Sequence, residues 1–428
     1  MVFWRKNKSK DIEKELANLN LFQFLGNDLP VINVDGYDYI NRIWRNVGAV
    51  YECTDLIYKK VLNSPLTFYR VKNSNEYRKY LALKDKDSFN ARVAKAKSLE
   101  EVSIPVLEER LLKPNEHQNY TNFIGVLALS YLVTGNAYIH KDTSKSTGRP
   151  IELYALNELF IESGGMHNPV KAYYQFYQTD NEKMYPADSI YHMKTPNISF
   201  DIGASQLYGV SPLRAYLEPL RTIEESYKQS SKQMKSGGVL SVIFPRDKED
   251  QFERSQREAF IRGIRKALIS NDDFSRLTTS SVALGSEQIG LSAGDLDLLS
   301  IRSASEESIY RCYHVPLSRY NQRASTQNNQ AESNKQLVYD AVAPLCEVIS
   351  EALTNHIGVH YDNTIIELDW SKLPEMAVNM REMQDYIGRQ VDLGIISRDE
   401  ARAMFGYGET GISEMKDFYY KGRKLQGS

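Results

Sequence analysis

The sequence predicts an α+β protein in which the first 200 residues mix helices with short strands. Two patterns give this prediction. Short stretches that alternate apolar and polar residues recur between residues 137 and 193, separated by turn residues. Apolar residues at helical spacing run through about 46–62, 122–134 and 331–357. With 428 residues, 42% of them hydrophobic, the chain is long enough for two or three packed cores.

The chain should begin with an arm, residues 1–40, which is polar at first and then carries Leu, Phe and turn residues. The helix at about 46–62 should stop at Ser64-Pro65, because the residue before a proline disfavours helix. Leu66–Val71 then alternates like a strand. Residues 73–103 are rich in Lys, Asp and Ser and predict an exposed insertion with some helix.

A second clear helix is predicted at about 122–134, with Thr121 as its N-cap and Gly135 as its C′ residue. Short strands follow this helix as far as residue 193. Their sequences are AYIH, IELYAL, LFIES, AYYQFYQ and SIYHMK. This region therefore predicts a mixed α+β domain.

The sharpest local signal is the start of the next helix. Ser211 is a good N-cap, and Pro212 suits the first helical position. Apolar residues then recur at helical spacing to Met234, and Gly237-Gly238 should end the helix. Pro219 should kink this helix in its second turn or restart it there.

A small module follows, in which two strands flank an amphipathic helix and predict a βαβ-like unit. The strands lie near 239–244 and 281–284, and the helix at about 249–269. The helix carries Arg254, Arg257 and Arg262 among several acidic residues. Alternating charge of this kind usually marks a solvated face, and a docking surface is the functional alternative.

A polar segment then separates two helices. The first helix, at about 303–313, should stop before Pro316. Residues 316–330 are nearly all polar, have no hydrophobic periodicity and predict an exposed loop near the upper end of ordinary loop lengths. The segment carries Arg319 and Arg323 but no acidic residue. It is either a functional loop or a disordered part of the surface.

The last predicted elements are a long helix, a strand and a helical pair. The long helix, at about 331–357, contains Pro344 and should kink near 340–344. Ser397 and Glu400 have the spacing of a capping box. The strand is predicted at 364–369 and the two helices at about 375–393 and 398–405, the first closed by Gly394.

The charge balance excludes a protein that coats nucleic acid with a basic surface. Lys and Arg number 53 against 55 Asp and Glu, which gives a net charge of −2. The three cysteines are widely spaced, which favours a reducing compartment. We expect neither a signal peptide nor a membrane-spanning helix, because no long apolar run occurs. The 28 tyrosines indicate either subunit interfaces or codon bias.

Motifs that carry chemistry are nearly absent from this sequence. The string Gly406-x-Gly408-x-x-Gly411 follows a helix rather than a strand, so we reject a dinucleotide site. There is no GxxxxGK[ST] motif for a nucleotide phosphate. His356 and His360 are four residues apart, but no third metal ligand is evident. We therefore predict no enzyme activity, no metal site and no cofactor.

A series of short motifs runs in one order through residues 50 to about 405. They are Val50-Tyr51-Glu52-Cys53 with Ser64-Pro65-Leu66, Leu111-Leu112 with Pro114-Asn115, Gly135-Asn136-Ala137-Tyr138, Ile151 to Asn157, Asp188-Ser189-Ile190-Tyr191-His192, Gly209-Val210-Ser211-Pro212-Leu213, Val315-Pro316, and Asn328 or Asn329 with Pro344. In this order they resemble the portal family of long-tailed bacteriophages. Tyr313-His314 departs from the Phe-Gly that the family usually has, and residues 73–103 are longer than its common insertion.

The resemblance implies a portal fold and a ring, typically of twelve subunits, at one capsid vertex. Its parts would be a wing (1–208 and 331–372), stem helices (210–236 and 295–315), an α/β clip (237–294), a tunnel loop (316–330) and a crown with the C-terminal tail (373–428). The ring would conduct double-stranded DNA during packaging and ejection. It would be assembled in the host cytoplasm and remain in the virion.

The resemblance also implies partners and site residues. Terminase large subunit and neck proteins would dock on the clip, where Arg254, Arg257 and Arg262 lie. Major capsid and scaffolding proteins would also contact the ring. The tunnel loop would face the DNA with Arg319, Asn321, Gln322, Arg323, Gln327 and Asn328.

Two other classes of protein stay open at this point. One is a different ring or tube component of a phage neck or tail, although such proteins are often shorter and lack paired helices around a small module. The other is a cytosolic enzyme with an unrecognised site, which would sediment as a compact monomer.

Overall fold

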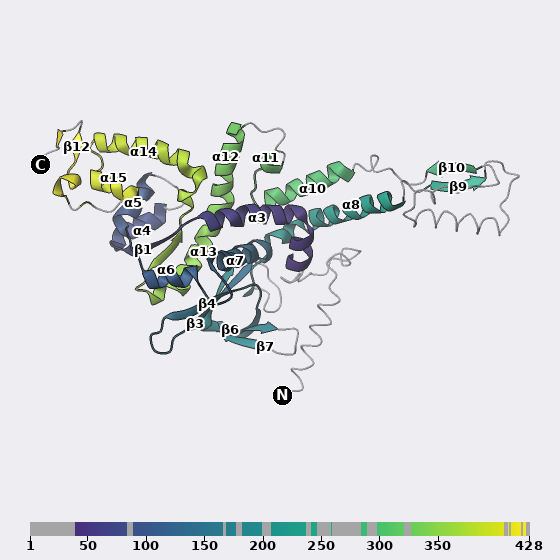
Figure 1. Ribbon diagram of the computed structural model, residues 1–428, viewed down its shortest axis with the longest axis horizontal. Helices are drawn as coiled ribbons and strands as arrows, with labels where there is room; N and C mark the ends of the chain where they lie inside the picture. The colour runs from purple at the N-terminus through teal and green to yellow at the C-terminus, as the bar shows by residue number, and fades with distance from the viewer. Residues whose placement is uncertain are drawn as a thin grey trace. The chain divides into compact units, whose positions relative to one another are not determined.

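The computed structural model describes residues 39–83, 89–165, 168–176, 182–198, 207–236, 241–245, 258, 284–288, 298–320, 327–405, 410, 412–420 and 423–424. The chain divides into two compact units (Figure 1). The first is built from Met1–Arg214 and Tyr310–Ser428, and the second from Ala215–Ile309.

The first unit begins with a π-helical turn, η1 (Tyr39–Trp44), and the long helix α3 (Gly48–Asn63). Helix α3 forms because its apolar residues recur every three or four positions, and Val50, Cys53, Ile57 and Val61 on this face are fully buried. The helix ends at Ser64, before Pro65, as the sequence predicts.

A three-stranded antiparallel sheet follows, in the order β11-β1-β2. Its strands are β1 (Leu66–Val71), β2 (Leu99–Glu101) and β11 (Ile365–Leu368). Leu66 pairs with Leu368, and Tyr69 pairs with Ile365 on one side and with Glu101 on the other. The sheet therefore joins segments that lie about 300 residues apart in the chain.

Residues 73–103 were expected to be an exposed insertion, but part of this segment is buried. It forms a pair of packed helices, α4 (Ser74–Leu83) and α5 (Phe89–Ser98), and then strand β2. Ala91 and Ala94 of α5 are buried. Small alanine side chains allow close packing, so a segment with a polar composition still contributes to a core.

Helix α6 (Pro105–Leu112) and helix α7 (Tyr120–Thr134) come next. The N-cap of α7 is Asn119, whose side chain accepts a hydrogen bond from the Asn122 backbone at 2.8 Å, so the prediction of Thr121 was wrong by two residues. Gly135 ends the helix in the left-handed region, with φ of 76°, as predicted.

The strands that follow form two three-stranded antiparallel sheets, in the orders β4-β3-β8 and β5-β6-β7. Their bounds are β3 (Asn136–Thr143), β4 (Pro150–Leu156), β5 (Phe160–Gly165), β6 (Asn168–Phe176), β7 (Glu182–Pro186) and β8 (Ile190–Lys194). Strand β7 was not predicted, because its sequence EKMYP lacks regular alternation. Tyr138, Leu159, Tyr173, Tyr185 and Ile190 form the buried cluster of this region.

The predicted helix after Ser211 is divided into two parts. A 3₁₀ helix, η5 (Pro212–Tyr216), leads into α8 (Leu217–Ser236). Pro219 lies in the first turn of α8, where its missing N–H leaves no helical hydrogen bond unmade. This confirms the prediction that the helix restarts near Pro219.

The second unit contains α8, strand β9 (Ser241–Pro245), strand β10 (Leu284–Gln288) and most of α10 (Leu298–Cys312). Figure 1 shows α8 and α10 side by side, and the Arg302 guanidinium lies 4.9 Å from the centre of the Tyr227 ring. Strands β9 and β10 are antiparallel. The βαβ-like prediction is therefore wrong, because a βαβ unit pairs its strands in parallel.

The rest of the first unit is mainly helical. The elements are α11 (Leu317–Tyr320), α12 (Gln327–Leu337), η8 (Val338–Val342), α13 (Ala343–His356), η9 (Gly358–His360), η10 (Trp370–Lys372), η11 (Pro374–Met376), α14 (Ala377–Asp392), α15 (Arg398–Met404), η12 (Ser413–Lys416), β12 (Tyr419–Tyr420) and β13 (Arg423–Lys424). The capping box at Ser397 and Glu400 is confirmed by reciprocal bonds of 2.9 and 3.1 Å.

The predicted irregularity before Pro344 is a π-helical segment, η8, between α12 and α13. The Ala343 backbone N–H bonds to the Val338 carbonyl, five residues back. Proline supplies no N–H, so the hydrogen-bonding pattern changes just before it.

Cys53, Cys312 and Cys346 are free thiols, and Cys53 and Cys346 are fully buried. Burial raises the pKa of Cys53 well above its ordinary value and raises the pKa of Cys312 and Cys346 to about 12. Among the residues that the structure describes, no helix is long and apolar enough to cross a membrane.

Candidate functional site

A tight junction joins the end of α7 to the chain just before η5. Gly135 and Gly209 approach each other so closely that a Cβ at Gly209 would lie within 3.0 Å of the Gly135 carbonyl oxygen and of the Thr195 backbone nitrogen. Asn136 bridges the contact, because its Oδ1 accepts from the Gly209 N–H at 2.6 Å and its Nδ2 donates to the Gly209 carbonyl at 3.2 Å. Ser211 Oγ donates to the Val133 carbonyl at 2.6 Å.

His192 completes this junction from strand β8. Its Nε2 lies 2.9 Å from Asn136 Oδ1, and its ring stacks on Tyr138 with the centroids 4.4 Å apart. Burial, helped by the nearby Lys194 charge, lowers the pKa of His192 to about 3. The imidazole is therefore neutral at pH 7. This junction explains physically why the motifs around Gly135-Asn136 and Gly209-Val210-Ser211 have their residues.

The polar segment at 316–330 contains more helix than predicted, because α11 occupies its start and α12 begins at Gln327. Ser318 Oγ lies 2.6 Å from Ser333 Oγ, and the Arg319 guanidinium hydrogen-bonds Asn334 Oδ1. Helix α11 is thus held against α12, and Arg319 is half-buried.

Glu375 lies near the same place. Burial opposes its ionisation, but a hydrogen bond from Lys60 and the Arg319 charge lower the pKa of Glu375 below its usual value. Arg319 therefore belongs to a network that joins α11, α12, α3 and η11.

The other predicted site residues fall largely outside the described part of the chain. Asn321, Gln322 and Arg323 lie there, as do Arg254, Arg257 and Arg262 and the glycine string from Gly406. Gln327 and Asn328 are the first two residues of α12.

The histidine pair at 356 and 360 does not form a metal site. Helix α13 ends at His356, and His360 lies in η9 beside Lys141, whose Nζ is 3.0 Å from His360 Nε2. Within the described ranges, no three His, Cys, Asp or Glu side chains are placed to hold a metal ion.

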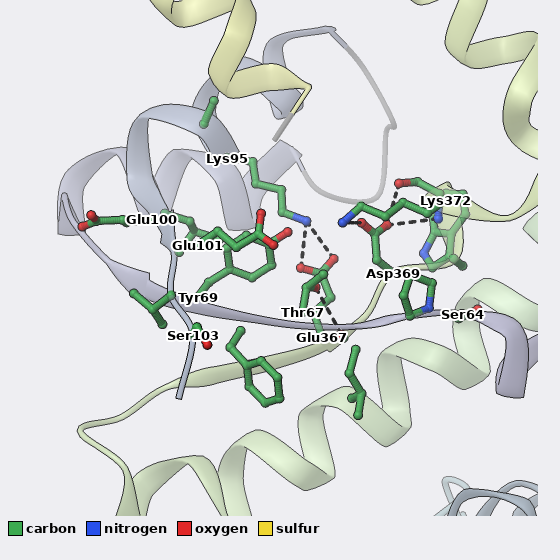
Figure 2. Close-up of a pocket in the computed structure, with 18 of the residues that line it drawn as sticks. Ser64, Thr67, Tyr69, Lys95, Glu100, Glu101, Ser103, Glu367, Asp369 and Lys372 are labelled. Atoms are coloured by element: carbon green, nitrogen blue, oxygen red, sulfur yellow. Dashed lines mark hydrogen bonds and ion pairs between the residues drawn. The ribbon is translucent and has the colours of Figure 1, made fainter. Parts of the chain in front are cut away.

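The first unit also contains a pocket of about 1220 Å³ that sequence reasoning missed (Figure 2). The sheet β11-β1-β2 forms one wall, α5 forms another, and residues 369–372 close one end. Its charged residues are Lys72, Lys95, Glu100, Glu101, Glu108, Glu347, Glu367, Asp369 and Lys372. The pocket is a site of mixed charge with aromatic side chains among its walls.

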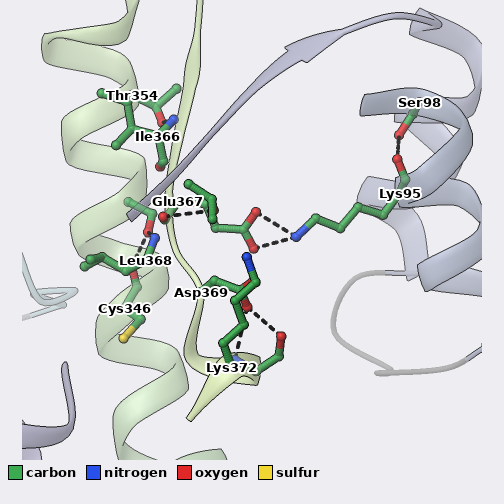
Figure 3. Close-up of polar contacts among 12 residues, drawn as sticks. Lys95, Ser98, Cys346, Thr354, Ile366, Glu367, Leu368, Asp369 and Lys372 are labelled. Atoms are coloured by element: carbon green, nitrogen blue, oxygen red, sulfur yellow. Dashed lines mark hydrogen bonds and ion pairs between the residues drawn. The ribbon is translucent and has the colours of Figure 1, made fainter. Parts of the chain in front are cut away.

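An ammonium group lines this pocket, and Figure 3 shows its contact with the Glu367 carboxylate. Lys95 Nζ is 2.8 and 2.7 Å from the two carboxylate oxygens of Glu367 and 4.8 Å from the centre of the Tyr69 ring. Burial alone would lower the pKa of Lys95, but the Glu367 charge and the tyrosines Tyr80 and Tyr69 raise it above its usual value. Lys95 is therefore firmly charged at pH 7.

The profile of the phage portal protein family matches residues 48–406. The chain belongs to the phage portal protein family. The matched range contains the pocket and also the glycine junction, which is the contact between Gly135 and Gly209. It extends over most of the sequence in which the motifs were recognised.

Solved structures share the fold of this family member. A chain in the neck of an empty gene transfer agent (GTA) particle, computed with C6 symmetry, is 18% identical, with a TM-score of 0.61, and the match covers 90% of this chain and 97% of that one. A chain in the neck of the native GTA particle, computed with C12 symmetry, has a TM-score of 0.59 at the same identity and coverage. An uncharacterised protein of Rickettsia felis is 21% identical over 324 residues, which are 74% of this chain and 81% of that protein.

Proposed function

We propose that this chain is the subunit of a twelve-membered portal ring at one capsid vertex. The ring conducts double-stranded DNA into the capsid during packaging and out of it during ejection, and it remains in the virion. The family match over residues 48–406 carries this proposal. The likeness in fold to a chain in the neck of a particle computed with C12 symmetry supports the subunit number.

The charge of the chain suits a conduit. DNA that moves through a channel must not be held by many phosphate contacts, because each neutralised phosphate adds to the affinity. A net charge of −2 keeps the overall attraction of the chain for DNA phosphates low.

Within the ring, the parts take the roles that the family resemblance implies. Residues 1–208 with 331–372 act as the wing, 210–236 and 295–315 as the stem, and 373–428 as the crown. Residues 237–294 act as the clip, on which terminase large subunit and neck proteins dock through Arg254, Arg257 and Arg262. The antiparallel strands β9 and β10 lie on either side of this basic segment in the chain.

The segment 316–330 faces the DNA in this proposal. The contacts of Arg319 with α12 hold the start of the segment, so Arg319 positions it. Arg323 then offers a cation to the phosphates, and Asn321, Gln322, Gln327 and Asn328 offer hydrogen bonds that exchange easily. Each exposed phosphate contact is weak and screened by salt, which lets DNA slide.

The ring is tested by mass photometry and negative-stain imaging of the purified chain. Twelve copies of a 49.0 kDa chain give a particle of about 590 kDa with a central hole. A compact monomer at every concentration and salt would contradict the proposal and would favour an enzyme instead. A closed tube that does not lie at a capsid vertex of the particle would favour another component of a phage neck or tail.

The channel role is tested with Arg323→Gln in an assembling particle. We expect unchanged ring mass and altered DNA packaging or retention, because only the channel cation is lost. Lys171→Gln, which removes an exposed cation of strand β6, is the matched control and should behave like the wild type. Normal packaging by Arg323→Gln would count against a DNA contact at this position.

A further inference from the structure

Helix α11 is a single turn, so its position depends on contacts made by its side chains. Figure 1 shows it beside α12, and polar contacts join the two helices. Ser318 Oγ lies 2.6 Å from Ser333 Oγ, and Arg319 Nη2 donates a hydrogen bond to Asn334 Oδ1. Both contacts are made to neutral groups, so neither balances the charge of Arg319.

A carboxylate lies near this arginine, on an element that also packs on α12. Glu375 belongs to η11, its Oε1 accepts a hydrogen bond from Lys60 Nζ of α3, and its side chain is 16% exposed. Burial opposes the ionisation of Glu375, but Lys60 and, to a smaller extent, Arg319 lower its pKa. The Arg319 charge therefore lies close enough to stabilise this carboxylate.

A donor and an acceptor of this network have no partner. Within the described residues, Arg319 Nε and Glu375 Oε2 are buried, and neither has a hydrogen-bond partner. A buried polar atom without a partner costs free energy, and the cost is larger when its group is charged. A hydrogen bond between these two atoms would remove both costs and would pair opposite charges.

We propose that Glu375 is a positioning residue for α11, because its Oε2 accepts a hydrogen bond from Arg319 Nε in solution. A guanidinium has five N–H groups, so Arg319 can bond Glu375 and Asn334 at once. The carboxylate then ties α11 to η11 and, through Lys60, to α3. Helix α11 begins the segment that faces the DNA, so the consequence for DNA rests on the proposed function, whereas the anchor itself does not.

Trypsin cleavage after Arg319 in the full-length chain measures this anchor. An arginine that is held in the fold enters the protease site only when α11 is released. Glu375→Met should raise the initial rate of this cleavage about fivefold, the change expected for the loss of one charge-assisted hydrogen bond between partly exposed groups. Mass spectrometry of the products identifies the cleaved bond. An unchanged rate would overturn the proposal.

Lys60→Met is the matched control for this variant. Both substitutions break the Lys60–Glu375 pair and replace a charged side chain by the same residue. Only Glu375→Met removes the partner of Arg319, so Lys60→Met should leave the rate of cleavage after Arg319 close to that of the wild type. Equal increases in the two variants would show a general loosening of α3 and η11 and would overturn the role of Glu375.

A disulfide supplies a rescue that does not depend on Glu375. Ser318→Cys/Ser333→Cys replaces two hydroxyls whose oxygens lie 2.6 Å apart, so a bond between the new sulfurs would fasten α11 to α12. In the Glu375→Met background, oxidation should return the cleavage rate to the wild-type value, and a reductant should raise it again. A bridge that forms, as its mass shows, without slowing cleavage would contradict release of α11 as the effect of Glu375→Met.

DNA packaging in an assembling particle separates this inference from the proposed function. Glu375→Met should keep the ring mass and should alter packaging or retention, as Arg323→Gln does. Faster cleavage after Arg319 together with normal packaging would uphold the anchor and would contradict the DNA contact of this segment. Unchanged cleavage would overturn the anchor, whatever the result for packaging.

Discussion

The glycine junction and the charged pocket belong to the same unit but differ in packing and in how their polar groups are satisfied. At the junction, Gly135 and Gly209 leave no room for a Cβ. The Asn136 side chain accepts a hydrogen bond from the Gly209 N–H and donates one to the Gly209 carbonyl. The pocket encloses about 1220 Å³ and keeps Glu100 and Glu101 exposed at its wall. One region has satisfied its polar groups internally, and the other leaves carboxylates exposed to solvent.

This difference separates a closely packed site from a solvent-accessible one. Closely packed backbone with complete hydrogen bonding cannot admit a ligand, so residues there act on stability alone. Partly exposed charges around a cavity contribute little to stability. Substitutions in the two regions should therefore differ in size and in kind.

The largest effect is expected for Gly209→Ala. The added Cβ would meet backbone atoms of Gly135 and Thr195, which cannot move as a side-chain end can. We expect a loss of at least about 4 kcal/mol in the free energy of unfolding, or failure to accumulate as soluble protein. Urea denaturation followed by fluorescence measures the change.

Gly388→Ala is the matched control for this prediction. Gly388 lies in α14, and a Cβ there would have no atom within 4 Å. Alanine should stabilise this helix by up to about 1 kcal/mol. Similar denaturation midpoints for the two variants would mean that the junction is looser than described.

The two regions also differ in how well the sequence predicts them. The junction depends on residues within short motifs, Gly135-Asn136 and Gly209-Val210-Ser211, and their backbone demands are visible as a left-handed cap and an N-cap signal. The main helices and most strands were likewise predicted from periodicity. Local constraints of this kind leave local patterns.

The pocket could not be predicted in this way. Lys95 and Glu367 are 272 residues apart, and they meet only because β1 pairs with β11 and with β2. Nothing in the sequence around either residue indicates the partner. The antiparallel pairing of β9 with β10 was missed for the same reason, since strand direction depends on a connection that periodicity does not describe.

A smaller effect is expected when the junction is acidified. His192 has a pKa of about 3 in the folded chain, below the 6.5 of a free imidazole, so below pH 6.5 the unfolded chain binds more protons. The stabilising contribution is complete above pH 6.5 and is lost as the pH falls toward 3. Between pH 7 and pH 5 we expect a loss of about 2 kcal/mol from this residue.

His192→Gln tests that origin. Glutamine can still donate to Asn136 Oδ1 but does not titrate, so the variant should be less stable at pH 7 and should depend less on pH. Denaturation curves at pH 5, 6 and 7 measure the slope. An unchanged slope would assign the effect to other groups, of which His356, also buried with a pKa of about 3, is the first to examine.

The smallest effect concerns the ion pair in the pocket. Lys95 and Glu367 are each about 25% exposed, so solvent screens part of their attraction. A double-mutant cycle of Lys95→Met and Glu367→Gln should give a coupling of about 1 to 2 kcal/mol. The raised pKa of Lys95 means that this contribution is complete below the ordinary lysine pKa and is lost only at still higher pH.

The exposed pair Lys171–Glu162, with side chains 64% and 30% exposed, is the comparison for that cycle. Its coupling should stay below about 0.5 kcal/mol and should vanish in high salt. Equal coupling energies for the two pairs would show that solvent screens the pair in the pocket as strongly as it screens the exposed pair.

The three thiols give this protein a practical advantage. The thiolate is the reactive form of cysteine, and Cys312 and Cys346 have a pKa of about 12, with that of Cys53 also strongly raised. At pH 7.5 a maleimide reagent should therefore leave the native chain almost unmodified. A single cysteine introduced at Arg323 could then carry a fluorophore while all three native cysteines stay in place, so that DNA passage becomes observable in real time.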